Sequence, residues 1–237
     1  MTVQCSHCGL IYANPQATPE TLAAHYSDHY HAVRERLRPS LGRLHDKYAR
    51  QASELFARLG PDARVVDVGC AEGEWLAYQA QHPYRELIGI EVSTQMARIA
   101  QSTVPRAVIH CCQPVDAPIA RGTIHRANIW HVLEHTNDPM GVLAAISSWL
   151  RPDGELNIGV PSGHSMAARL YRVIWPGRSL LGEHLWLFAP RHVVTMVERA
   201  GLTVTRVRFY ANRRRFPWPN FHANFVHCEA RKLPRHG

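Results

Sequence analysis

Residues 64 to 73 constrain the fold of this chain more than any other segment. They read Arg-Val-Val-Asp-Val-Gly-Cys-Ala-Glu-Gly, an apolar β-branched run containing Asp67 that continues into a loop between Gly69 and Gly73. A helix is expected to begin directly after this loop, at Glu74. A buried strand that leads through a glycine loop into a helix is the entry unit of a nucleotide-binding α/β sheet.

The remainder of the chain alternates between strand-like and helix-like segments. Strands are expected at 64–68, 86–91, 106–110, 123–130, 155–160, 202–210 and 222–229, and helices at 19–27, 40–59, 73–81, 93–102, 139–150 and 190–200. Arg151-Pro-Asp-Gly154 is expected to be a turn. This alternation predicts an α/β fold with a mostly parallel sheet covered on both faces. No helix separates the last two strands, so they are expected to be antiparallel.

Length and composition set outer limits on the class of protein. With 237 residues, the chain suits one α/β domain at 40–237 with an N-terminal extension at 1–39. It has no run of about 18 apolar residues, so no integral membrane segment is expected. The N-terminus lacks the pattern of a secretory signal, and the six cysteines show no disulfide framework. A cytoplasmic location is therefore predicted, and the oligomeric state stays open.

The formal net charge of +8 raises the question of a nucleic-acid partner. Its basic residues are scattered, with one cluster at Arg213, Arg214 and Arg215. Such a cluster is more often a solvated turn than a track for phosphates. Nucleic acid is therefore not the expected partner.

Two acidic residues follow neighbouring strands and narrow the ligand. Asp67 lies where a pyrophosphate would approach, and its carboxylate would repel that group while attracting a cationic or hydroxyl-rich ligand. Glu91 ends the next strand, eighteen positions after Gly73, where an acid can accept hydrogen bonds from both ribose hydroxyls of an adenosine. The pair favours S-adenosylmethionine over a nicotinamide dinucleotide.

The order of the motifs resembles that of class I S-adenosylmethionine-dependent methyltransferases, in the branch that modifies small molecules or glycans. The matching motifs, within residues 60 to 210, are Asp67-Val-Gly-Cys-Ala-Glu-Gly73, Ile90-Glu91, His131-Val-Leu-Glu-His135, Arg151-Pro-Asp-Gly154 and Val160-Pro161. The resemblance implies a Rossmann-like, doubly wound sheet of seven strands with an antiparallel last strand.

The resemblance also implies a set of cofactor contacts. Asp67, Gly69, Cys70 and Gly73 would surround the methionine end, Glu91 would hold the ribose, Val92 would pack on the adenine, and His131 would lie beside the sulfonium. Three positions depart from the family pattern: Ala71 replaces a glycine, Cys112-Gln113 replaces Gly-Asp, and Ile124-His125 replaces Phe-Asp. An adenine contact would therefore need the Gln113 carbonyl or Asp116.

The segment His131-x-x-Glu134-His135 has the spacing of an inverted zinc-protease motif. It follows an apolar strand rather than lying on a helix, which argues against a protease. A Glu-His pair holds a divalent ion at this location in some RNA-end and ubiquinone-type methyltransferases. The favoured interpretation is that Glu134 and His135 fix the loop, so no metal is expected.

The N-terminus contains Cys5-x-x-Cys8-Gly9, which resembles one knuckle of a zinc ribbon. A structural zinc needs four ligands, and His25 and His29 would have to complete the set. The aromatic segment around them is better suited to cover the cofactor. A half-site without zinc is therefore the favoured interpretation.

Residues 163–188 follow the fifth strand and are expected to form a substrate lid, a membrane or partner contact being the alternative. A hydroxyl acceptor benefits from a histidine base, and the candidates are His131, His135 and His184. The prediction is methyl transfer to oxygen on a small molecule or sugar. The alternatives are an NAD(P)-dependent oxidoreductase, disfavoured because Gly-x-Gly-x-x-Gly is absent, and a non-enzymatic zinc or nucleic-acid-binding module.

Overall fold

A computed structural model describes residues 2–18, 21–22, 45–162, 184–211, 214–216 and 225–234. The chain divides into two compact units. One unit comprises Pro19–Asn128 and Trp149–Arg151, and the other comprises Met1–Thr18, Ile129–Ser148 and Pro152–Gly237. Among the described residues, eight strands are hydrogen-bonded in the order β10-β9-β11-β7-β6-β3-β4-β5, and three more form the sheet β1-β2-β8.

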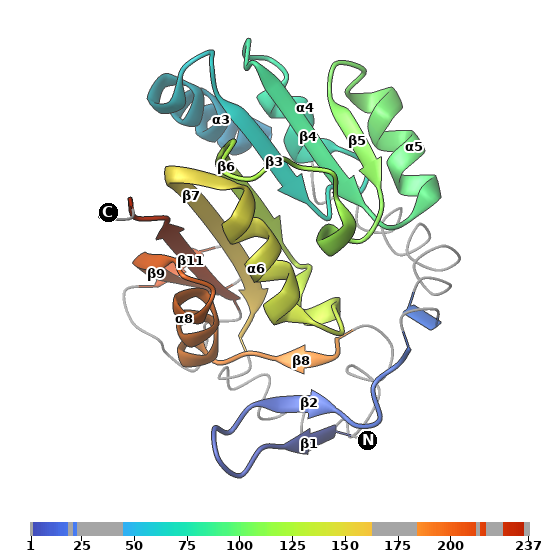
Figure 1. The fold of residues 1–237 in the computed structure, drawn as a ribbon, viewed down its shortest axis with the longest axis vertical. Coiled ribbons are helices and arrows are strands. Elements are labelled where there is room, and N and C mark those ends of the chain that lie inside the picture. Colours follow the sequence, from blue (N-terminus) through green and yellow to red (C-terminus); the bar gives the residue numbers. More distant parts are fainter. Residues whose placement is uncertain are drawn as a thin grey trace. The chain divides into compact units, whose positions relative to one another are not determined.

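The unit built around Pro19–Asn128 contains the glycine loop and the first parallel strands (Figure 1). Its strands are β3 (Arg64–Val68), β4 (Glu86–Glu91), β5 (Val108–Cys111) and most of β6 (Ile124–Trp130). Its helices are α3 (His45–Leu59), α4 (Glu74–Gln79) and α5 (Thr94–Thr103). β4 pairs in parallel with both β3 and β5, which brings the carboxyl ends of these strands to one edge.

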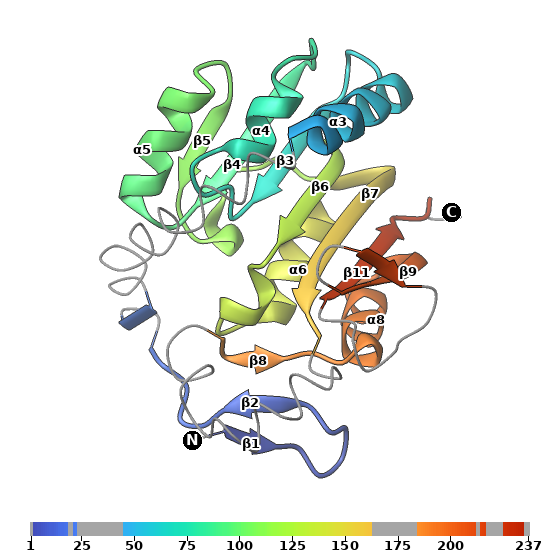
Figure 2. The same ribbon diagram turned by 180° about the vertical axis from the view of Figure 1, so that it is seen from behind.

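The core of this unit lies between the sheet and its helices. Helix α4 contacts α3, α5 and β4, so the three helices lie side by side (Figure 2). The buried cluster comprises Ala63, Val65, Cys70, Leu76, Tyr84, Leu87, Ala100, Val104 and Ala107. Strand β3 is buried along Val65–Val68, as expected for a central parallel strand, and Asp67 is the one acidic residue in this buried run. The α5 start is capped as the sequence predicts, since Ser93 Oγ accepts the Met96 N–H at 3.4 Å.

The other unit contains antiparallel strands. It holds most of α6 (Pro139–Trp149) and β7 (Leu150–Pro161), with α8 (Pro190–Arg199), β9 (Thr203–Ala211), β10 (Arg214–Phe216) and β11 (Phe225–Arg231). β11 pairs antiparallel with β7 and with β9, and α8 contacts β9 and β11. The expected antiparallel last strand is thus confirmed, and β10 adds a short hairpin that the sequence did not predict.

The N-terminal strands β1 and β2 form a small sheet with β8, which the sequence did not predict. β1 (Thr2–Gln4) and β2 (Ile11–Ala13) form a hairpin, and β8 (Trp186–Leu187) pairs with β2. The end of the expected lid is therefore a strand, because Leu187 pairs with Ile11 and Trp186 pairs with Tyr12. The rest of the lid, 163–183, lies outside the described residues, as do His25 and His29.

The expected turn at Arg151–Gly154 is wrong, because these residues begin β7. The Asp153 N–H donates to the Lys232 carbonyl at 2.7 Å, and the Lys232 N–H donates to the Gly154 carbonyl at 2.9 Å. Backbone pairing with Lys232 therefore makes these residues part of a strand, although their composition is typical of a turn. By contrast, β3 and β4 have the predicted bounds. No helix of the described residues is long and apolar enough to cross a membrane.

Candidate active site

The loop after β3 is shaped by three residues with positive φ. These are Gly69 at 72°, Ala71 at 49° and Gly73 at 80°. The Gly69 and Cys70 N–H groups donate to the Ile90 carbonyl at 2.8 and 3.0 Å, which ties the loop to the end of β4. A Cβ on Gly73 would lie 3.3 Å from Ala100 Cα, so the loop can pack this closely on α5 only with glycine there.

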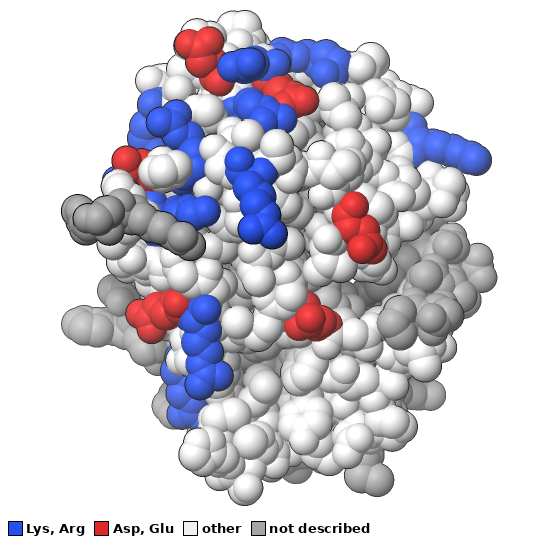
Figure 3. Space-filling view, viewed as in Figure 1, with Lys and Arg blue, Asp and Glu red and all other residues white. Residues whose placement is uncertain are grey.

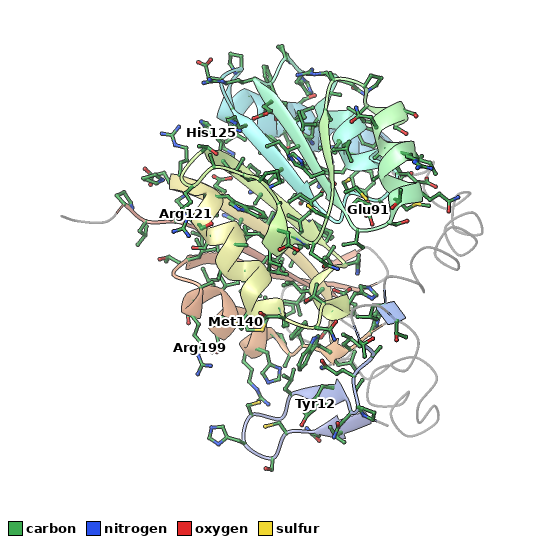
Figure 4. All side chains as sticks on the ribbon, turned by 45° about the vertical axis from the view of Figure 1, so that its right-hand side comes forward. Tyr12, Glu91, Arg121, His125, Met140 and Arg199 are labelled. Carbon is green, nitrogen blue, oxygen red and sulfur yellow. The ribbon has the colours of Figure 1, made fainter. Side chains whose placement is uncertain are left out.

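Glu91 lies at the carboxyl end of β4, as Figure 4 shows, and its carboxylate organises the loop. Its Oε2 accepts the Ala71 N–H at 2.9 Å, and its Oε1 accepts the Ser93 N–H at 2.9 Å. The residue is only 8% exposed. Each carboxylate oxygen can accept more than one hydrogen bond, so Glu91 can hold the loop and also accept bonds from a hydroxyl ligand.

Asp67 lies beside Glu91 in the same buried region. Its Oδ1 accepts a hydrogen bond from Asn128 Nδ2 at 2.7 Å, and the residue is 5% exposed. Burial, together with the negative charge of Glu91, raises the pKa of Asp67 to about 7 despite the hydrogen bond from Asn128. Two adjacent carboxylates of this kind disfavour a pyrophosphate and favour a cationic ligand.

Replacing Asp67 with asparagine is expected to raise the free energy of unfolding, relative to the parent protein, more at pH 8 than at pH 5. The folded-state pKa of about 7 exceeds the ordinary 3.8, so the stability that this carboxyl contributes is complete below pH 3.8 and lost as pH rises through 7. Asparagine cannot ionise and can still accept from Asn128. The gain should be on the order of 1–3 kcal/mol in the free energy of unfolding, measured by urea denaturation.

The exposed residue Asp62 provides the control, because Asp62→Asn removes a carboxylate from the same unit without removing a buried charge. The difference in the free energy of unfolding between pH 5 and pH 8 should change less in Asp62→Asn than in Asp67→Asn. A stability difference between Asp67→Asn and the parent that does not change from pH 5 to pH 8 would contradict the raised pKa.

The other predicted cofactor residues lie around this edge in different environments. Cys70 points into the core, where its Sγ lies 2.8 Å from the position of a Cβ on Gly89, and burial raises the pKa of its thiol. Only its backbone is therefore available to a ligand. Val92 is half-buried and Gln113 is exposed. The Gln113 carbonyl accepts the Asp116 N–H at 3.0 Å, which begins a short 3-10 helix.

His125 lies at the opposite end of the strands from Glu91 (Figure 4). Its Nδ1 accepts the Arg64 N–H at 3.2 Å, and its Nε2 lies 2.8 Å from Arg151 Nη1. Partial burial, and then these positive neighbours, lower the pKa of His125. With Arg64, Arg85, Glu86 and Thr123, it lines an open pocket of about 510 Å³. The family departure at 124–125 therefore lies away from the glycine loop.

The three histidines proposed as bases meet at Glu134 in the other unit. His131 has a φ of 56°, and its Nδ1 lies 3.1 Å from Glu134 Oε1. His135 Nε2 lies 3.9 Å from the same oxygen, and the His135 and His184 rings are 4.7 Å apart. The Glu134 side chain is 1% exposed and that of His131 is 46% exposed. A buried carboxylate thus contacts an imidazole that solvent can reach.

Trp130 precedes His131, and its ring packs against Gly159 of β7. A Cβ on Gly159 would lie 2.5 Å from the Trp130 ring, so only glycine leaves room for it. The His131 N–H donates to the Gly159 carbonyl at 2.9 Å, and the His227 ring lies 5.2 Å from that of Trp130. His227 also contacts the Asn157 side chain. Gly159 therefore sets the position of two adjacent side chains at the end of β6.

Cys5 and Cys8 lie in the turn between the paired strands β1 and β2. Backbone N–H groups of Cys8 and His7 point at the Cys5 thiol and lower its pKa, with help from the Cys8 thiol. The Cys8 carbonyl lies 2.7 Å from Arg191 Nη2 and 2.9 Å from His192 Nε2, which attaches the turn to α8. That this pair is a half-site without zinc stays a prediction.

Sequence reasoning missed three groups that position the acidic residues. Ala71 and Ser93 supply backbone N–H groups to Glu91, and Asn128 bonds to Asp67. Almost any residue can supply a backbone N–H group, so the residue types at positions 71 and 93 do not reveal these two donors. Asn128 could have been found, because it is a polar residue within the apolar strand Ala127–Trp130.

Comparisons with known proteins agree with this geometry. Residues 40–207 match a family model described as a methyltransferase domain. A 117-residue stretch is 33% identical to an uncharacterized 37.1 kDa protein in transposon TN4556 of Streptomyces fradiae, covering 47% of this chain. The match spans only 33% of that relative's length.

Solved structures share the fold. A methyltransferase of Thermotoga maritima, described as a possible histamine N-methyltransferase, has a TM-score of 0.66 at 16% identity over 89% of this chain and 99% of its own. The 1,6-didemethyltoxoflavin-N1-methyltransferase of Burkholderia thailandensis, with bound S-adenosylhomocysteine, has a TM-score of 0.64 at 21% identity over 98% and 99%.

The family match and the shared fold thus identify a class I methyltransferase, the class that uses S-adenosylmethionine as its methyl donor. The family match covers most of the chain, and the chain belongs to the methyltransferase domain family.

Proposed function

We propose that this protein transfers a methyl group from S-adenosylmethionine to an oxygen atom of a small-molecule or sugar acceptor. The donor would bind at the carboxyl edge of β3 and β4, with Glu91 accepting from the ribose hydroxyls. The donor carries positive charge on its sulfonium and ammonium groups, which suits the buried carboxylates of Asp67 and Glu91. Gly69, Gly73 and the Cys70 backbone would surround its methionine end, and Val92 and Gln113 its adenine.

The observation that best supports the acceptor side is the contact between His131 and Glu134. With a proton on Nδ1, His131 donates to Glu134 Oε1, and its Nε2 is then the basic nitrogen. A buried carboxylate that orients an imidazole in this way is the arrangement of a general base. His131 would accept the hydroxyl proton of the acceptor, with His135 and His184 as the other candidate bases.

S-adenosylmethionine supplies an activated methyl group, so the chain's own contribution is positioning. Methyl transfer needs the acceptor oxygen in line with the breaking bond, and water must be kept out. Trp130 is 38% exposed and lies next to His131, so its ring can support a sugar or another flat acceptor face. An acceptor that stacks on the Trp130 ring would lie close to His131, the proposed base.

An acceptor screen tests the proposal. The purified protein would be incubated with S-adenosylmethionine and sets of hydroxyl-, amine- and carbon-acid acceptors, with S-adenosylhomocysteine release as the readout. Turnover is expected with hydroxyl acceptors, and mass spectrometry should locate the methyl group on oxygen. Turnover confined to amines would overturn the choice of oxygen, and the two solved structures named above are described as N-methyltransferases.

The alternatives make different predictions. Tight binding of NAD without binding of S-adenosylmethionine would support an oxidoreductase. A nucleic-acid module predicts strongly salt-dependent RNA or DNA binding. On the face shown in Figure 3, the Lys and Arg side chains of the described residues alternate with acidic and uncharged ones, which does not favour a phosphate track. A cytoplasmic location stays a prediction.

A further inference from the structure

Glu134, His135 and His184 form a compact group of metal-ligating side chains. One candidate ligand atom from each residue lies within 4.8 Å of the other two. It is the one such group among the residues that the structure describes. We infer that these three residues bind a single divalent transition-metal ion.

The carboxylate of Glu134 provides an independent argument for a ligand. The residue is 0% exposed, so its charge is removed from water. Its Oε1 contacts His131, but its buried Oε2 has no hydrogen-bond partner among the described residues. A buried carboxylate oxygen without a donor is costly, and a metal ion would compensate it. The two oxygens would then have separate partners, His131 on Oε1 and the ion on Oε2.

The backbone holds the three side chains together although His184 is fifty positions from Glu134 in the sequence. The Leu185 N–H donates to the Glu134 carbonyl at 2.7 Å, and the Trp186 indole donates to the Thr136 carbonyl at 2.7 Å. These bonds join Leu185 and the start of β8 to the 3-10 turn at Leu133–His135 and to Thr136, which follows it. The site is therefore positioned before any ion arrives.

The donor atoms indicate the class of metal. Two imidazole nitrogens with one carboxylate oxygen suit zinc, iron, cobalt or nickel, whereas magnesium and calcium prefer oxygen ligands. His131 would hold Glu134 as an outer-shell partner. Three protein ligands leave at least one coordination position open, as in catalytic zinc sites. We assign the open coordination position to the acceptor oxygen, an assignment that rests on the proposed function.

Cobalt binding tests the site without reference to activity. The protein would carry Cys5→Ser and Cys8→Ser, so that a thiolate site cannot contribute. Titration with Co²⁺ should produce visible d–d absorption that saturates at one equivalent, with competition by Zn²⁺ and none by Mg²⁺. Glu134→Gln and His184→Asn should each weaken Co²⁺ binding by at least about tenfold.

The matched control is His82→Asn, since His82 stacks on Phe56 in the other unit and should leave Co²⁺ binding unchanged. S-adenosylmethionine binding by each variant shows that it is folded. No saturable Co²⁺ band, or a band that survives both Glu134→Gln and His184→Asn, would overturn the metal site while leaving the proposed methyl transfer intact. Co²⁺ binding without any methyl transfer would overturn only the function.

Discussion

Replacing Glu91 with alanine is expected to weaken S-adenosylmethionine binding by at least about tenfold, because charge-assisted hydrogen bonds contribute about 1.5–3 kcal/mol. The variant would lose the acceptor for the ribose hydroxyls. It would also lose the bonds from the Ala71 and Ser93 N–H groups, which shape the loop. Calorimetric titration measures the dissociation constant directly.

Two variants separate these contributions. Glu91→Gln keeps one carbonyl oxygen and should bind with intermediate affinity. Glu86→Ala removes an acid from the opposite end of the same strand, where Glu86 pairs with Arg64 at 2.5 Å, and should bind S-adenosylmethionine as the parent does. The ribose assignment would be refuted by unchanged affinity in Glu91→Ala.

Replacing His131 with asparagine is expected to lower kcat by about 10²–10⁴-fold, the usual contribution of a general base. Asparagine tolerates the positive φ of 56° better than most residues, so the backbone should be preserved. Single-turnover rates at saturating acceptor and donor would measure the effect. The test uses the acceptor that the screen identifies.

His125→Asn serves as the control for this experiment, since His125 lies at the other end of β6 and contacts Arg64 and Arg151. Its kcat should match the parent value. A His131→Asn enzyme with full kcat would exclude His131 as the base. A change confined to the acceptor KM would assign His131 to binding alone.

The secondary structure around the glycine loop was predictable because local rules act there. The β-branched run gives β3, and Ser93 caps α5. Strand β4 has the predicted bounds for the same reason. The turn at Arg151–Gly154 was not predictable, since its strand pairing depends on Lys232, far away in the sequence.

Sequence motifs alone also indicated the family, which the family match confirms. Asp67, the glycine loop and Glu91 are separated by short, regular intervals that parallel strands bring to one edge. Ligand sites in such sheets lie beyond the carboxyl ends of the strands, so the motifs that end β3 and β4 predict where the donor binds.

The sequence by itself determined the fold class, the loop and the acidic residues that point to the methyl donor. Only the tertiary structure decided which groups surround them. Asn128 reaches Asp67 across 61 positions, and His184 meets Glu134 through backbone bonds of the segment before β8. These contacts depend on packing between segments distant in the chain, and no residue spacing records such packing. The same packing removes Glu134 from water, which turns a common acidic residue into a candidate metal ligand.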